Sequence, residues 1–308
     1  MDALSLLLDN VQLYGTKYYS LEGSGDWSYS LTRQDTILFY LVVSGSFCIT
    51  VGNYLRKAYA GDMIMIPNSY QHRCYAVGHH SKDAQPLDER LLNSEKHLIE
   101  LEGKGAPNAS VILIECQYDK EMIRALLSAL PLILPEHEDQ PESRFEILDV
   151  GMKLLTLESA HERMGKMAVI NHWASIMMIE CLRTHIESLP EATDSWLQAM
   201  KDPYLAKALA VMHNAPDRSW TIHKLAEIAG MSRSSFAQRF KDIVGMPPLT
   251  YLIDYRLRLA ARYLCLQQNS ISRISELVGY ASDSTFSQAF KRVYGVSPKA
   301  YRQQYQKR

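Results

Sequence analysis

The sequence predicts an α+β protein of several domains: an N-terminal β-barrel, central helices and a C-terminal all-α domain. Three observations predict it. Short β-branched and aromatic segments separated by turn residues fill residues 36–117, apolar residues at helical spacing follow residue 145, and the last hundred residues contain a repeat. We place the three parts at 1–142, 143–201 and 202–308, because 308 residues exceed the usual size of one compact core.

Strands are expected over 36–43 and 47–51 with a turn at Ser44-Gly45, then over 54–59, 63–66, 73–77 and 111–117. Residues 78–109 interrupt this run. We expect them to form an excursion between two strands that is partly helical or mobile. Many short strands with regular turns indicate an antiparallel sandwich or barrel.

Two helices are expected after the prolines at 131, 135 and 141, over 145–158 and 168–189. Two roles for their apolar faces stay open, a dimer interface or packing on the barrel. Asp202 followed by Pro203 is typical of a helix N-terminus and is expected to begin the last domain.

The last domain contains an internal duplication. Thr221–Gly230 aligns with Ser270–Gly279 at an offset of 49 residues, and Phe236–Tyr251 aligns with Phe286–Tyr301 at an offset of 50. In each copy a Thr or Ser is expected to cap a short helix and a Gly to end it. A second Ser then begins another helix, which two Phe residues anchor to the core. The capping and turn residues are, copy by copy, Thr221, Gly230 and Ser232, and Ser270, Gly279 and Ser282.

The charge is distributed unevenly along the chain. Residues 219–308 carry 14 Lys and Arg against 5 Asp and Glu, whereas residues 1–218 carry 19 against 29. A basic end suits a polyanionic partner such as DNA, although a solvated basic surface would look the same. With no signal peptide or apolar run of membrane length, we expect a cytoplasmic protein with no membrane partner. The five scattered Cys, without a CxxC pair, do not fit a disulfide framework or a zinc ribbon.

The segments WTIHKLAEIAGMSRSSFAQRF (220–240) and ISRISELVGYASDSTFSQAFKRVYG (271–295) resemble the AraC/XylS family of bacterial transcription regulators, and the match spans about residues 203–305. The resemblance implies a homodimeric regulator, an activator that binds double-stranded operator DNA beside RNA polymerase. It also implies two helix-turn-helix units joined by a rigid helix over 249–266, with two reading helices in successive major grooves.

The exposed faces of the two reading helices supply the expected DNA contacts. The base-contact candidates are Ser234, Ala237, Gln238, Asp283, Ser284, Ser287 and Gln288. For Asp283 a role in capping its own helix stays open beside base contact. The phosphate-contact candidates are Arg233, Arg239, Lys241, Arg273, Lys291 and Arg292.

Residues 61–72 (GDMIMIPNSYQH) resemble the second motif of cupin barrels, which ends in a metal-ligating histidine in catalytic members. No histidine precedes Gly61, so the usual His-x-His partner is missing. We therefore expect no cofactor and leave the metal open, because Cys48, Cys74, His79 and His80 could supply other ligands.

The order of the parts is similar to the cupin-bearing subgroup of these regulators, and MDALSLLL with GSGDW (23–27) resembles the member that responds to reactive chlorine species. The candidates for sensing a small molecule or an oxidant are His72, Cys48, Cys74 and Cys116. Residues 18–22 lack the second cysteine expected for chlorine sensing.

Two hypotheses in which the protein is an enzyme stay open beside the regulator hypothesis. For a regulator we expect no catalytic residues. One is a cupin metalloenzyme fused to a DNA-binding tail, and the other is a DNA-repair methyl acceptor carrying the same tail. The first lacks its metal ligands, and the second lacks an activated cysteine cluster.

Overall fold

The computed structural model describes residues 3–8, 13–68, 70–78, 84–92, 97–118, 123, 126–127, 129–135, 146–161, 163–190, 196–266 and 268–306. Its contacts divide the chain into two compact units. The β unit comprises Gln12–Tyr118 and Leu130–Ser188, and the helical unit comprises Met1–Val11, Asp119–Ala129 and Leu189–Arg308. The central helices thus group with the strands, while the boundaries predicted at 142 and 201 stay predictions.

Nine strands of the described residues form the β unit's sheet, in the order β7-β2-β6-β3-β9-β1-β8, with β4 and β5 also paired to β3. The strands are β1 (Leu13–Ser24), β2 (Ser28–Leu31), β3 (Thr36–Val51), β4 (Tyr54–Tyr59), β5 (Met63–Ile66), β6 (His72–Ala76), β7 (Gln85–Pro86), β8 (Leu98–Glu102) and β9 (Pro107–Tyr118). The predicted barrel architecture is confirmed.

The turn predicted at Ser44-Gly45 is wrong, because β3 continues through it from Thr36 to Val51. The first half of β3 pairs with β5 and β9, and the second half pairs with β4 and β6. Gly45 has φ +74°, and a Cβ there would lie 1.9 Å from the Asn108 carbonyl oxygen of β9. The glycine therefore serves a bend and a close approach rather than a turn.

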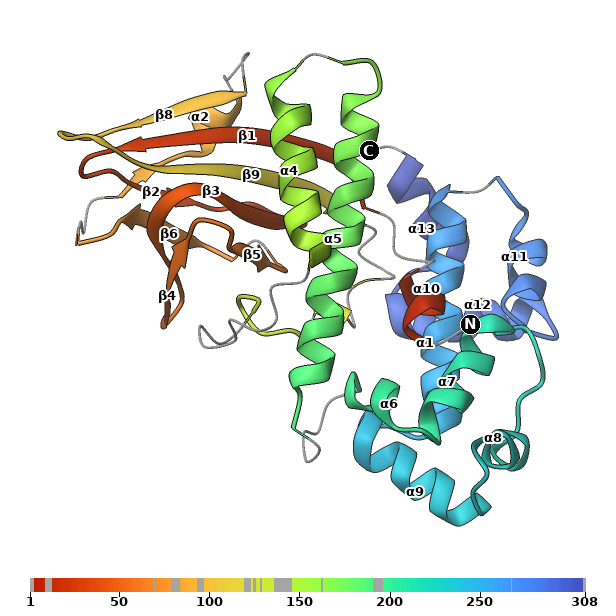
Figure 1. Ribbon diagram of the computed structural model, residues 1–308. Helices are drawn as coiled ribbons and strands as arrows, with labels where there is room; N and C mark the ends of the chain where they lie inside the picture. Colours follow the sequence, from red (N-terminus) through yellow and green to blue (C-terminus); the bar gives the residue numbers. More distant parts are fainter. Residues whose placement is uncertain are drawn as a thin grey trace. The chain divides into compact units, whose positions relative to one another are not determined.

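The two halves of β3 differ in burial, which explains their different sequences. Residues 36–42 are buried without alternation, whereas residues 47–51 alternate between buried and half-buried. Helices α4 (Glu146–Ala160) and α5 (Lys166–Ser188) cover the outer face: α4 packs on β3, and α5 packs on β1 and β9 (Figure 1). A strand covered on both faces needs a continuous apolar run, and TILFYLVV supplies one.

The core of the β unit lies between the two parts of the sheet and is formed by side chains from strands on both sides. Its fully buried members include Tyr40, Phe47, Ile64, Cys74 and Leu113. One-sided burial of this kind sets which residues of each strand face inward.

The excursion predicted at 78–109 contains more regular structure than expected. It includes the short helix α2 (Asp88–Leu92) and strand β8, which pairs parallel with β1 from Ser20↔Leu98 to Ser24↔Glu102. The strands predicted from the sequence do not include β1, β2, β7 or β8. In β8 the alternation LIELE, with Ile99 and Leu101 buried, was the overlooked signal.

The described helices of the helical unit include α1 (Ala3–Leu8), α6 (Gln198–Lys201), α7 (Leu205–Asn214), α8 (Ile222–Ala229), α9 (Arg233–Val244), α10 (Pro248–Leu266), α11 (Ile271–Leu277), α12 (Asp283–Tyr294) and α13 (Pro298–Gln306). The N-terminal helix α1 packs on α7. No helix in the part of the chain that the structure describes is long and apolar enough to cross a membrane.

Asp202 lies at the N-terminus of α7, as the sequence predicts. The Asp202 carboxylate accepts from the backbone N–H groups of Tyr204 and Leu205, both at 2.9 Å. Leu205, Leu209 and Met212 are fully buried in the core that α7 shares with α8 and α9.

Candidate nucleic-acid interface

The first helix-turn-helix unit consists of α8 and α9. Thr221 Oγ1 accepts from the backbone N–H of Lys224 at 3.2 Å and begins α8, and Gly230 ends it in the left-handed conformation with φ +68°. Ser232 Oγ accepts from the backbone N–H of Ser235 at 3.2 Å and begins α9. These are the capping residues that the sequence predicts.

The second unit, α11 and α12, repeats the same construction. Ser270 Oγ accepts from the backbone N–H of Arg273 at 3.0 Å, and Ser282 Oγ accepts from the backbone N–H of Thr285 at 3.3 Å. Gly279 follows the last turn of α11 with φ +78°. The predicted duplication is therefore present in the local structure.

Two phenylalanines anchor the second helix of each unit. Phe236 and Phe240 in α9, and Phe286 and Phe290 in α12, are fully buried. Within each pair the ring centroids lie 5.7 Å apart. Because positions four residues apart share one face of a helix, burying this face leaves the opposite face open to a partner.

The open faces carry the predicted DNA contacts. Among the base-contact candidates, Ala237 and Ser287 are half-buried, and the exposed ones are Ser234, Gln238, Asp283, Ser284 and Gln288. The phosphate-contact candidates are all exposed: Arg233, Arg239, Lys241, Arg273, Lys291 and Arg292. The side chains thus lie where a DNA duplex could reach them.

Several candidates already have partners within the chain. Arg239 forms an ion pair with the buried Asp202, with Nε donating at 2.7 Å, which ties α9 to the start of α7. The Gln238 amide donates to Asp242 at 2.7 Å. Arg273 pairs with Glu276 at 3.0 Å, a contact between exposed groups that contributes little to stability.

Asp283 contacts the first helix of its own unit. Its Oδ1 accepts a 2.8 Å hydrogen bond from Ser275 Oγ, which links α12 to α11, while Ser282 provides the cap. Besides the two roles considered for Asp283, base contact and helix capping, the structure shows a third: Asp283 joins the two helices of its unit.

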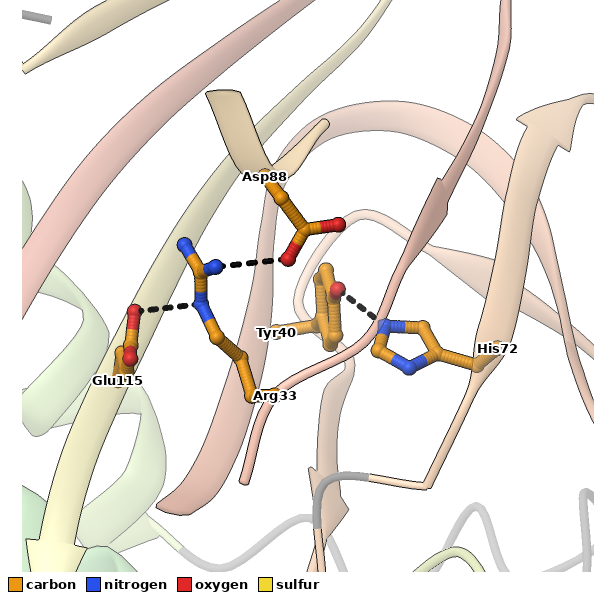
Figure 2. A network of polar contacts seen from close by, with 5 residues as sticks. All are labelled: Arg33, Tyr40, His72, Asp88 and Glu115. Atoms are coloured by element: carbon orange, nitrogen blue, oxygen red, sulfur yellow. Dashed lines mark hydrogen bonds and ion pairs between the residues drawn. The ribbon is translucent and has the colours of Figure 1, made fainter. Parts of the chain in front are cut away.

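In the β unit, His72 lies in the barrel interior beside Tyr40 (Figure 2). The Tyr40 hydroxyl lies 2.6 Å from Nε2, and the Tyr70 carbonyl oxygen lies 2.7 Å from Nδ1. Nδ1 must donate to the carbonyl, so Nε2 accepts from Tyr40. Burial lowers the pKa of His72 to about 4, and the bond to Tyr70 opposes this shift. The imidazole is therefore neutral at pH 7.

This interior does not fit the metal site of catalytic cupins. Both nitrogens of His72 are engaged by other groups, and no group of three or more His, Cys, Asp or Glu among the described residues could hold a metal ion. His79 and His80 lie outside the described residues.

Close to the Tyr40–His72 pair, Arg33 bridges two carboxylates from distant segments (Figure 2). Arg33 Nη1 lies 2.7 Å from Asp88 Oδ1 at the start of α2, and Nε lies 3.2 Å from Glu115 Oε2 in β9. The guanidinium thereby fastens α2 to the barrel. A second feature, a pocket of about 210 Å³, is lined by Trp27 in the β1–β2 connection and by residues of β2, β7, α2 and β8, including Tyr29, Arg90 and Glu102.

The candidate redox cysteines are poorly placed for thiol chemistry. Burial raises the pKa of Cys74 and that of Cys116 to about 12, although the neighbouring hydroxyls of Tyr29 and Tyr40 lower the pKa of Cys74 and that of Thr16 lowers the pKa of Cys116. Cys74 pairs with Ile49 across β6 and β3, so the half-buried Cys48 projects from the other face of the sheet.

Two protein-family models match the chain: one described as a helix-turn-helix domain over residues 225–304, the other as a cupin over residues 2–187. The transcriptional regulator AlkR of Acinetobacter baylyi is 35% identical over 312 residues, which cover 99% of this chain and 100% of AlkR. The chain belongs to the AraC-like transcription regulators that carry a cupin domain. It is accordingly a DNA-binding regulator.

Two further similarities are more local. The RCS-specific transcriptional activator RclR of Escherichia coli is 40% identical over 89 residues, 29% of this chain and 31% of RclR. The crystal structure of the DNA-binding domain of the transcriptional factor AdpA with a target DNA is 33% identical, covers 34% of this chain and 93% of that one, and has a TM-score of 0.33. The predicted likeness to the chlorine-responsive activator is thus confirmed for less than a third of the chain.

In this AraC-like regulator, sequence reasoning missed the ion pairs that organise the candidate sites. Arg33 lies 55 residues from Asp88 and 82 from Glu115, and Arg239 lies 37 residues from Asp202. Tyr40 lies in the apolar run at 36–43, and this run predicts only that its side chains are buried in the core. No local pattern marks such pairs, since each depends on how distant segments meet.

Proposed function

We propose that α9 and α12 enter successive major grooves on one face of an operator, about 34 Å or one DNA turn apart. The observation that carries this proposal is the duplicated unit, in which buried phenylalanines leave a polar helical face exposed in each copy. The excess of basic residues after residue 219 adds a sequence-independent attraction to phosphates.

The second unit is proposed to read more of the sequence than the first. Gln288 is exposed on α12, and a glutamine can pair with adenine through two hydrogen bonds. Gln238 must exchange its bond to Asp242 before its amide can do the same. Ser234, Ser284 and Ser287 offer single hydrogen bonds, and Ala237 offers a methyl contact to thymine.

Substitutions on the two reading helices test this proposal. We expect Gln288→Ala to weaken binding to the preferred site by about 1–3 kcal/mol and to relax base choice, with a smaller effect for Gln238→Ala. Lys241→Ala and Lys291→Ala should weaken binding to any DNA and reduce its salt dependence. The measurement is fluorescence anisotropy on a selected site and on random DNA at two salt concentrations. Equal losses of the Gln variants on both DNAs would contradict the assignment.

The regulator is further proposed to act as a homodimeric activator that contacts RNA polymerase and has no enzymatic activity. Val150 and Leu157 lie two helical turns apart on α4 and are 57% and 58% exposed. Met164, in the α4–α5 connection, is also exposed. An exposed apolar row on a helix is typical of a helix-helix interface, so we place the dimer contact there.

For the signal, we propose a small molecule bound by the cupin domain rather than an oxidant. The high pKa values of Cys74 and Cys116 keep both thiols protonated, and protonated thiols react slowly with oxidants. The test replaces Cys48, Cys74 and Cys116 with Ala and follows a reporter gene. Loss of an oxidant response in this variant would favour the oxidant instead.

A further inference from the structure

We propose that Arg256 and Gly279 form a clamp that holds the two helix-turn-helix units at one separation and thereby sets the half-site spacing that the regulator accepts. This inference rests on the proposed function, because it concerns how α9 and α12 are presented to the same operator. All the contacts that support it lie inside the helical unit.

The two units have separate hydrophobic cores. In the described chain, the core cluster built around α7, α8 and α9 takes Tyr251 and Leu252 from α10 and no residue beyond them. The second core contains Phe286, Phe290 and Tyr301, with the last two in edge-to-face contact at 5.3 Å. Since α10 connects two cores, bending or twisting of this helix would change the distance between the reading helices.

Arg256, in the middle of α10, is bonded to the loop that connects α7 with α8. Its Nε donates to the Pro216 carbonyl at 2.6 Å, and its Nη2 donates to the Arg218 carbonyl at 2.8 Å. The loop is itself held by Trp220, whose indole N–H donates to the Ala215 carbonyl at 2.8 Å. The guanidinium is therefore hydrogen-bonded to the loop of the first unit, which the Trp220–Ala215 bond also holds in place.

Gly279, in the turn of the second unit, lies against the same loop and the same guanidinium. A Cβ at this position would lie 2.6 Å from the Asp217 carbonyl oxygen and 2.8 Å from Arg256 Nη2. Burial lowers the pKa of Arg256, while Asp217 and Tyr280 oppose the shift, in keeping with their position beside the guanidinium. The turn of the second unit thus contacts the first unit directly.

The contact continues from the turn to the second reading helix. Tyr280 follows Gly279, and its ring meets that of Phe286 in α12 edge-to-face at 5.5 Å. Phe286 is fully buried and anchors α12. A series of contacts that does not run along α10 therefore joins the first unit to the second reading helix. It passes from the loop at 215–220 through Arg256, Gly279 and Tyr280 to α12.

The equivalent glycine of the first unit shows that the helix-turn-helix fold does not itself need this close approach. Gly230 has a similar φ of +68°, but a Cβ there would meet nothing within 4 Å. Both glycines adopt the positive φ that the turn requires, whereas Gly279 also lets the Asp217 carbonyl and Arg256 approach closely. The duplication thus supplies a matched control.

A fixed separation affects binding because the two units bind one duplex as linked modules. A rigid link gives the second unit a high effective concentration at the matching spacing and little at others. One added base pair moves the second half-site by about 3.4 Å and rotates it by about 35°. A looser link would lower affinity at the matching spacing and flatten the dependence on spacing.

The experiment first selects a preferred site from random duplexes with the full-length wild-type protein. Affinity is then measured by fluorescence anisotropy on duplexes in which one or two base pairs are added or removed between the half-sites. For the wild type we expect a loss of about tenfold or more for each added base pair, and for Arg256→Ala a loss of about threefold or less, with weaker binding at the original spacing. Arg256→Lys, which can donate to one of the two carbonyls, should lie between them.

The glycine pair separates the clamp from general destabilisation. Gly230→Ala and Gly279→Ala both place a side chain at positive φ and should both lower the melting temperature, but only Gly279→Ala should flatten the spacing profile. A spacing profile of Arg256→Ala as steep as that of the wild type would overturn the inference, as would equal flattening by the two Gly variants. If the wild type selects no bipartite site, the proposed two-helix reading itself fails, which is a distinct outcome.

Discussion

Tyr40 and His72 form a buried polar pair in the middle of an otherwise apolar core. A buried imidazole is tolerated when both of its nitrogens have partners, and here a hydroxyl and a carbonyl supply them. Protonation would turn Nε2 into a second donor facing the Tyr40 hydroxyl. The hydroxyl would then have to rotate its proton away, and the buried ring would carry a charge.

This arrangement predicts a pH dependence of stability. The pKa of His72 is lowered from 6.5 to about 4, so between these values the unfolded chain binds a proton that the folded chain does not. The contribution of His72 is present in full above about pH 6.5 and is lost as the pH falls toward 4, with a slope of at most about 1.4 kcal/mol per pH unit. We expect His72→Gln to show a shallower loss of stability across this window.

The measurement is urea denaturation at about pH 7 and about pH 5, followed by hydrogen exchange of peptides from β3 and β6. His172→Gln, which changes an exposed histidine of α5, is the control and should keep the wild-type slope. An unchanged slope in His72→Gln would show that the imidazole does not contribute to the pH dependence of the free energy of unfolding.

At the scale of elements, each helix-turn-helix unit depends on side chains that satisfy its own helix ends. Ser232 and Ser282 each cap a reading helix, while the buried phenylalanines set its rotation about its axis. Rotation decides which residues face DNA. A cap and an anchoring pair are thus sufficient to present the face from Asp283 to Arg292.

We expect Ser282→Ala to lower the free energy of unfolding by about 1 kcal/mol, because the Thr285 N–H loses its acceptor at the start of α12. Ser284→Ala changes an exposed serine two residues further on, where no capping bond is made, and should be neutral or slightly stabilising because Ala favours helices. Thermal or urea unfolding of the full chain measures both. Equal changes in the free energy of unfolding for the two substitutions would show that the Ser282 cap does not stabilise the protein.

At the scale of the whole molecule, the chain combines a cupin domain with a helix-turn-helix domain. Dimerisation would place four reading helices on one operator and raise affinity without any new base contact. The exposed apolar row on α4 belongs to the β unit, whereas both reading helices belong to the helical unit.

We expect Val150→Glu or Leu157→Glu to convert the proposed dimer to a monomer, because a carboxylate within an apolar helix interface would be desolvated. Leu55→Glu is the control: this residue is 62% exposed on β4, outside the proposed interface. Sedimentation equilibrium across a range of concentrations measures the mass. A mass that both α4 variants share with the wild type would remove α4 from the interface.

The sequence by itself determined the features whose signals lie within a few residues. The caps at Thr221, Ser232, Ser270 and Ser282, the turn glycines and the buried phenylalanines follow from local hydrogen bonding and helical periodicity, and the duplication repeats them. Strands β4 and β5 could be predicted to their ends for the same reason.

Only the tertiary structure decided where distant segments meet. Ser44-Gly45 looks like a turn until β9 is seen to pair with it, and the parallel pairing of β8 with β1 joins segments about 78 residues apart. Arg239 resembles a phosphate ligand until Asp202 is placed next to it, and Arg256 gains its role from carbonyls 40 and 38 residues away. The free energy of such pairs depends on separation in space, and separation along the chain does not determine it.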